Sequence, residues 1–230
     1  SIPGARTSAY TPPTIMSADV LGMASTILAI GMLVLAGYHL AVRVVRADGR
    51  CDPLLLGVAW PTATMAVAVA VATALGALRF LHIGPAMAVV GVLLLVLHRG
   101  ARWNGGAFGP LREALTAARR SVVRAPALPL LSAHAALVEL VHGTMRSPTS
   151  WDSLMYHLHL SATWLRTGAL DPILGPEPTR FYGYQPGNGS LWFWWWMAPS
   201  HSEFFVNLAS FLPWLALGLG AGAIARSLGV

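Results

Sequence analysis

The residues Asp19–Val42, DVLGMASTILAIGMLVLAGYHLAV, form an apolar run whose single charge, Asp19, stands at its first position. A helix needs about 20 consecutive apolar residues to cross the hydrocarbon core of a bilayer, and this run is longer. Arg43, Arg46 and Arg50 end the run, as basic residues end a membrane span on its cytoplasmic side. The run therefore predicts a transmembrane helix.

The composition of the whole chain supports a membrane protein. Of 230 residues, 55% are hydrophobic and only 10% are charged, and the mean hydropathy is +0.60. A soluble domain has about 25% charged residues. The net charge of +6 comes from arginines that cluster between apolar runs, so it indicates membrane topology and not nucleic-acid binding. The single cysteine, Cys51, excludes an internal disulfide and a cysteine-only metal site.

Four further apolar runs follow along the chain, and the run at 84–97 is short for a bilayer. We therefore expect an all-α polytopic membrane protein with about five transmembrane helices plus juxtamembrane interfacial helices. The expected organisation is an irregular tail at 1–18, four spans within 19–142, a loop at 143–202 and a fifth span within 203–230. The four later spans are Pro53–Leu78, Gly84–Leu97, Pro126–Val141 and Phe204–Ala225. The chain is expected to be the N-terminal portion of a longer protein.

The arginines predict one orientation in the cytoplasmic membrane. With five spans, ten of the fifteen arginines fall on one side, six of them in the loop at 99–124. The positive-inside rule places that loop in the cytoplasm and the loop at 143–202 outside. Within the 99–124 loop, Leu111–Ser121 is expected to form a short surface helix. The run LWFWWWMA at 191–198 is too short to cross, and its tryptophans favour an interfacial helix with wet indole N–H groups.

The residues Trp151–Gly168, WDSLMYHLHLSATWLRTG, have the pattern of an amphipathic helix outside the membrane. At helical spacing they form an apolar and a polar stripe. Because apolar spans lie on both sides, the helix is expected to lie flat at the membrane interface. The apolar stripe holds Trp151, Met155, Leu158, Ala162 and Leu165, and the polar stripe holds Asp152, Tyr156, His159, Thr163 and Arg166.

Asp152 is the candidate catalytic residue. A carboxylate at the membrane surface can take a proton from an acceptor beside a lipid phosphate, but an acid in a first helical turn can also simply stabilise the helix. His157 and His159 lie two residues apart, so only His159 shares the face of Asp152. The spacing of these residues is too weak to assign ligands to a metal ion, although a divalent cation is still a candidate cofactor. Glu139 lies near the end of a span: a carboxylate at membrane depth is costly and often functional, but Glu139 can also lie at the outer interface and form hydrogen bonds to the loop.

The same loop holds candidate substrate-binding residues. Arg166 and Arg180 can clamp a phosphate, or they can contact lipid headgroups. The Gly/Pro-rich run FYGYQPGNGS has aromatic and amide groups that suit a sugar, although the same composition makes turns. The substrate-binding candidates are Tyr156, His157, His159, Arg166, Arg180, Tyr182, Tyr184, Gln185 and Asn188.

Residues 126–228 resemble bacterial membrane glycosyltransferases of the GT-C superfamily, which includes protein-mannosyltransferase-like and aminoarabinose-transferase-like enzymes. The resemblance rests on a span, then WDSLMYHLHLSATWLRTGAL, then RFYGYQPGNGSLWFWWWMAPSHSEFFVNLASFL, then a span that ends in ARSLG. It implies that Asp152 is the catalytic base. It also implies transfer of a sugar from a polyprenyl-phosphate donor to an acceptor at the outer face of the membrane. Membrane lipids and this donor are the expected partners.

Two positions depart from the pattern of these enzymes. His159 stands where relatives often have proline. Ser190 stands where they often have a glutamate, and in this chain Glu177 or Glu203 would have to take over the role of that glutamate. Two other classes of protein stay open: a non-catalytic membrane scaffold or assembly subunit, and a transporter fragment. A transporter would show polar groups or broken helices at mid-membrane, and the spans offer few of either.

Overall fold

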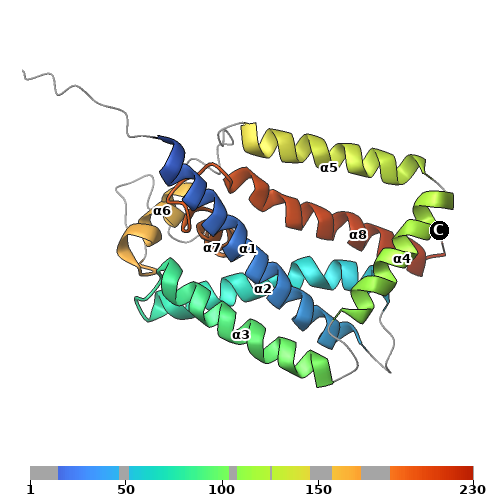
Figure 1. Ribbon diagram of the computed structural model, residues 1–230, viewed down its shortest axis with the longest axis horizontal. Coiled ribbons are helices and arrows are strands. Elements are labelled where there is room, and N and C mark those ends of the chain that lie inside the picture. The colour runs from blue at the N-terminus through green and yellow to red at the C-terminus, as the bar shows by residue number, and fades with distance from the viewer. Residues whose placement is uncertain are drawn as a thin grey trace, which may run out of the picture.

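A computed structural model of the chain describes residues 15–46, 52–103, 108–124, 126–145, 157–171 and 187–229 (Figure 1). Every regular element in these ranges is helical, which confirms the expected all-α class. The elements are α1 (Ile15–Val45), α2 (Pro53–Ala77), α3 (Ile83–Trp103), α4 (Gly109–Arg124), α5 (Ala127–Met145), α6 (Leu158–Thr167), α7 (Asn188–Met197), the 3-10 helix η3 (Val206–Ser210) and α8 (Phe211–Ser227).

Four helical stretches of the described chain are long and apolar enough to cross a membrane: 20–45, 53–77, 83–100 and 206–227. They make the chain a multi-pass membrane protein. The third is longer than the sequence indicated, because α3 continues through His98 to Trp103. Most of the run at 126–141 lies in α5, but His134, Glu139 and His142 lower the hydropathy of this helix, and it is not among the four. Helix α1 begins at Ile15, inside the expected tail.

Helix α2 lies at the centre of the bundle: it packs against α1 and α8, while α3 packs mainly against α1. The backbones of α1 and α2 approach closely at Gly37, where an added Cβ would lie 2.6 Å from the backbone N and Cα of Thr64. Thr64 is fully buried, and its hydroxyl donates to the Trp60 carbonyl at 2.9 Å. Small residues permit such close contacts between membrane helices.

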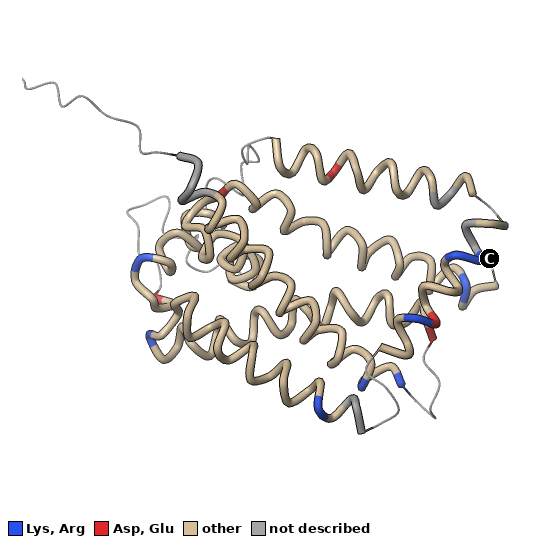
Figure 2. The backbone as a smooth tube through the Cα atoms, viewed as in Figure 1, with Lys and Arg blue, Asp and Glu red and all other residues tan. Residues whose placement is uncertain are grey.

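The described part of the bundle has two chemically different ends. Helices α6 and α7, the start of α1 and the α2–α3 turn lie at one end, which we call the α6–α7 end (Figure 1). Helix α4 lies at the other, which we call the basic end because most of the described arginines gather there (Figure 2). They are Arg43, Arg46, Arg99, Arg112, Arg119, Arg120 and Arg226, whereas Arg79 and Arg166 lie at the α6–α7 end.

Asp52 joins two helices at the basic end. It caps α2, accepting at Oδ1 from the backbone N–H of Leu54 at 2.8 Å and, at 3.4 Å, from that of Leu55. The Arg226 guanidinium donates to Oδ2 of the same carboxylate. This hydrogen bond holds the pKa of Asp52 below its usual value, although burial acts in the opposite direction. The last turn of α8 is thereby fixed to the start of α2.

Candidate functional site

Helices α6 and α7 pack together at the end of the bundle where the sequence places its candidate site. The α2–α3 turn fixes α6, because the Leu81 N–H donates to the Gly168 carbonyl at 2.9 Å. An ion pair of 2.7 Å between Arg79 and Asp171 lies beside this contact. Gly168 ends α6 with a φ of 66°, a left-handed conformation that glycine adopts without strain. We refer to α6 and α7 together as the α6–α7 platform.

The tryptophans of α7 lie inside the protein. Trp194 and Trp195 are fully buried, and the indole N–H of Trp195 donates to the Ala68 carbonyl of α2 at 2.9 Å. That of Trp192 donates to the Ala209 carbonyl at 2.7 Å. The sequence pattern led us to expect wet indoles in a headgroup layer, and this expectation is wrong. With ten residues, α7 is too short to cross a bilayer, and it packs into the bundle.

His157 and Ser190 connect the two helices of the platform. Nδ1 of His157 lies 2.9 Å from Oγ of Ser190, and Oγ of Ser161 lies 2.6 Å from the Ser190 carbonyl oxygen. Both serines are fully buried. Gly189 permits this approach, because a Cβ there would lie 3.1 Å from the His157 ring. Ser190, the position where relatives often have glutamate, therefore faces α6 from within the platform.

The described part of the polar stripe lies on the surface of α6. His159 and Arg166 are exposed, and Nη2 of Arg166 lies 3.5 Å from the Thr163 hydroxyl. Asn188 is exposed at the start of α7. On the opposite side α6 buries Leu160, Ser161 and Trp164 besides the expected Leu158. The candidates outside the described residues are Asp152, Tyr156, Arg180, Tyr182, Tyr184 and Gln185, and Glu177 also lies outside them.

An apolar groove begins next to the platform, between α5 and the rest of the bundle. Helix α5 contacts η3 and α4, and it comes so close to η3 that a Cβ at Gly143 would lie 2.6 Å from Cδ2 of Leu208. Between these contacts lies a cavity of about 470 Å³, which we call the α5 groove. Its lining residues are Ile30, Val34, Ala136, Leu137, Leu140, Trp196, Leu208, Phe211 and Leu212.

The α5 groove is apolar except for one indole. Trp196 lines it, and its Nε1 is buried with no acceptor among the described residues. The indole nitrogens of Trp164 and Trp194 are buried without an acceptor in the same way, so this feature is not specific to the groove. The sequence does not indicate this groove, because apolar residues that line a groove and those that face lipid look alike in a membrane helix. Trp196 gave no signal either, because the same run holds three other tryptophans that do not line the groove.

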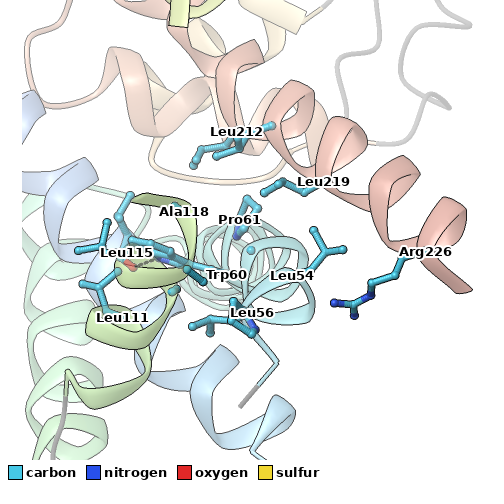
Figure 3. Close-up of a pocket in the computed structure, with 16 residues that line it drawn as sticks. Leu54, Leu56, Trp60, Pro61, Leu111, Leu115, Ala118, Leu212, Leu219 and Arg226 are labelled. Carbon is cyan, nitrogen blue, oxygen red and sulfur yellow. Dashed lines mark hydrogen bonds between the residues drawn. The ribbon is translucent and has the colours of Figure 1, made fainter. Parts of the chain in front are cut away.

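Val34 and Leu212 also line a second, larger cavity, of about 890 Å³, which extends between α2, α4 and α8 toward the basic end (Figure 3). These two side chains thus belong to the walls of both cavities. The α5 groove ends beside the platform, and the second cavity ends beside Arg226.

A buried histidine pair lies between α1 and α3. Nε2 of His39 lies 3.3 Å from Nδ1 of His98, and His39 is 2% exposed. Phe108 packs against both rings. The described residues hold no group of three or more histidine, cysteine or acidic side chains that could bind a metal ion. The contact of buried His39 with half-buried His98 joins α1 to α3.

Comparison with protein-family models, with curated proteins and with solved structures gives no match to this chain. Any assignment of function therefore rests on the motifs of the sequence and on the geometry described above.

Proposed function

We propose that the chain belongs to a membrane glycosyltransferase that moves a sugar from a polyprenyl-phosphate donor to an acceptor at the outer face of the cytoplasmic membrane. The observation that carries this proposal is the α5 groove, an apolar cavity that ends at Trp196 of the α6–α7 platform. A polyprenyl chain needs an apolar path that ends beside the reacting groups. The platform is also the region whose motifs resemble GT-C enzymes.

The distribution of charge supports the orientation. Most described arginines lie at the basic end, and the positive-inside rule assigns that end to the cytoplasm (Figure 2). The α6–α7 platform then faces outward. Helix α5 lies alongside α8 (Figure 1) and serves as a fifth crossing, with Glu139 toward its outer end. In this arrangement the donor reaches the α5 groove from the outer leaflet.

In the proposed reaction, Asp152 takes the proton of an acceptor hydroxyl while that oxygen attacks the anomeric carbon of the sugar. The bond from this carbon to the lipid phosphate breaks, and the configuration inverts. The phosphate leaves with both bonding electrons. Arg166 or Arg180 stabilises the growing negative charge on the phosphate. Exposed Arg166 on α6 is free of ion pairs with any described acid, which suits this role. No ligand is assigned to a divalent cation.

A transfer assay on the full-length protein in liposomes tests the proposal, with radiolabelled polyprenyl-phosphate sugars as donors. Leu137→Trp fills the α5 groove and is expected to raise the KM for the donor about tenfold, with little change in kcat, because the groove binds donor and transition state alike. Leu131→Trp is the matched control: Leu131 also lies on α5, is 65% exposed and does not line the groove.

The proposal is contradicted if no polyprenyl-phosphate sugar releases its sugar with the wild-type protein. It is also contradicted if Leu137→Trp and Leu131→Trp give the same KM.

A further inference from the structure

The larger cavity lies at the basic end, away from the α6–α7 platform, and we call it the α4 cavity. Its volume is about 890 Å³, within the range of about 300–1,000 Å³ typical of ligand sites. Pro53, Leu54, Leu56, Trp60 and Pro61 of α2 line one wall. Leu111, Leu115 and Ala118 of α4 face them, and Leu212 and Leu219 of α8 line a third side (Figure 3).

Helix α4 has two faces that differ in chemistry. The residues toward the cavity are leucine and alanine, and Leu115 keeps 62% of its surface exposed despite its apolar side chain. A shallow depression on the adjoining face of α4 is lined by Arg112, Glu113, Thr116 and Arg120. A helix that is apolar on one side and basic on the other suits the surface of an anionic membrane.

The cavity has a cation at one end. Arg226 lines it, and its side chain is 55% exposed while Nη2 donates to Asp52 (Figure 3). An arginine has five N–H donors, so a group fixed by one carboxylate can still bind a phosphate. Asp52 thus holds the guanidinium in place. The site combines an apolar volume with a fixed cation at its rim, and more arginines stand on the neighbouring helix.

We propose that the α4 cavity binds one anionic diacyl phospholipid from the leaflet at the basic end. An acyl chain lies between α4 and α8, and the phosphate contacts the Arg226 guanidinium. The complementary charge selects an anionic headgroup, and the apolar walls select a lipid over a free phosphate. Because the cavity lies at the opposite end from the platform, this inference does not depend on the proposed transferase activity.

A lipid titration of the purified full-length chain in detergent tests the proposal. Dioleoylphosphatidylglycerol is the anionic probe and dioleoylphosphatidylcholine the zwitterionic one, and native mass spectrometry reports the bound fraction. We expect the wild type to bind the anionic lipid about fivefold more tightly than the zwitterionic lipid. This factor corresponds to the attraction between one arginine and an anionic membrane surface. Arg226→Gln should remove this preference. Arg99→Gln, which removes an exposed arginine of α3 that does not line the cavity, should keep it.

A second pair of variants tests the apolar part of the site. Ala118→Trp fills the cavity and should weaken binding of the anionic lipid at least fivefold. Ala221→Trp places the same side chain at an exposed position of α8 outside the cavity and should leave binding unchanged. Equal affinity for the two lipids, or equal effects of the two tryptophans, would overturn the proposal. So would polyprenyl phosphate displacing the anionic lipid at equimolar concentration.

Discussion

An Asp152→Asn variant of the full-length protein is expected to lose sugar transfer by about 100-fold to 10,000-fold, the usual contribution of a general base. Asparagine has nearly the shape of aspartate, but its amide cannot accept the proton of an acceptor hydroxyl. Release of labelled sugar from the polyprenyl-phosphate donor, measured in liposomes at saturating donor, gives kcat directly. Binding of the donor should change little, because the proton moves only in the chemical step.

Asp171→Asn is the matched control for this prediction. Asp171 is an exposed aspartate at the same end of the bundle, and it pairs with Arg79 at 2.7 Å. An exposed ion pair contributes about 0–1 kcal/mol, so the control protein should fold and transfer sugar as the wild type does. Undiminished transfer by a properly inserted Asp152→Asn protein would refute the role of this carboxylate.

A Gly37→Leu variant is expected to destabilise the bundle by about 3 kcal/mol or more, at the upper end of overpacking effects. The added Cβ would lie 2.6 Å from the backbone N and Cα of Thr64, closer than real Cβ atoms come to any neighbour. Backbone atoms of α2 cannot turn aside as a flexible side chain can, so α1 and α2 must separate. Thermal unfolding of the purified protein, followed by circular dichroism, measures the loss.

Gly31→Leu provides the comparison for this effect. Gly31 lies on the same helix, and a Cβ there would have no neighbour within 4 Å. Both variants replace a glycine of the same helix by leucine, so the change in helix propensity is the same in both. The two variants differ only in the space available to the new side chain. If both variants unfold at the same temperature, the close contact of α1 and α2 does not hold the bundle together.

The membrane-crossing helices were predictable because length and hydropathy alone define them. Asp19–Val42 exceeds the thickness of a bilayer, and in the structure this run lies within α1. The short surface helix expected at Leu111–Ser121 is confirmed within α4. Helix α5 shows the limit of this reasoning, because Glu139 and two histidines keep its hydropathy below that of the four membrane-crossing helices.

The packing of the α6–α7 platform could not be read from the chain. The run LWFWWWMA matches an interfacial helix in composition, but the structure buries Trp194 and Trp195 and gives Trp195 an acceptor in α2. That acceptor is the Ala68 carbonyl, 127 residues earlier in the chain, and no local pattern identifies it. Of the candidate site, His159, Arg166 and Asn188 are exposed, and Asp152 lies outside the described residues.

The most direct test of the central claim, that the α5 groove holds the donor lipid, is photo-crosslinking with a polyprenyl-phosphate sugar that carries a photoreactive group in its prenyl chain. Mass spectrometry should find adducts on the segments 136–140 and 208–212, and Leu137→Trp should remove them. Leu217 and Ile224, exposed on α8 and outside the groove, should stay unlabelled. Equal labelling of these lipid-facing residues, unchanged by Leu137→Trp, would contradict the account.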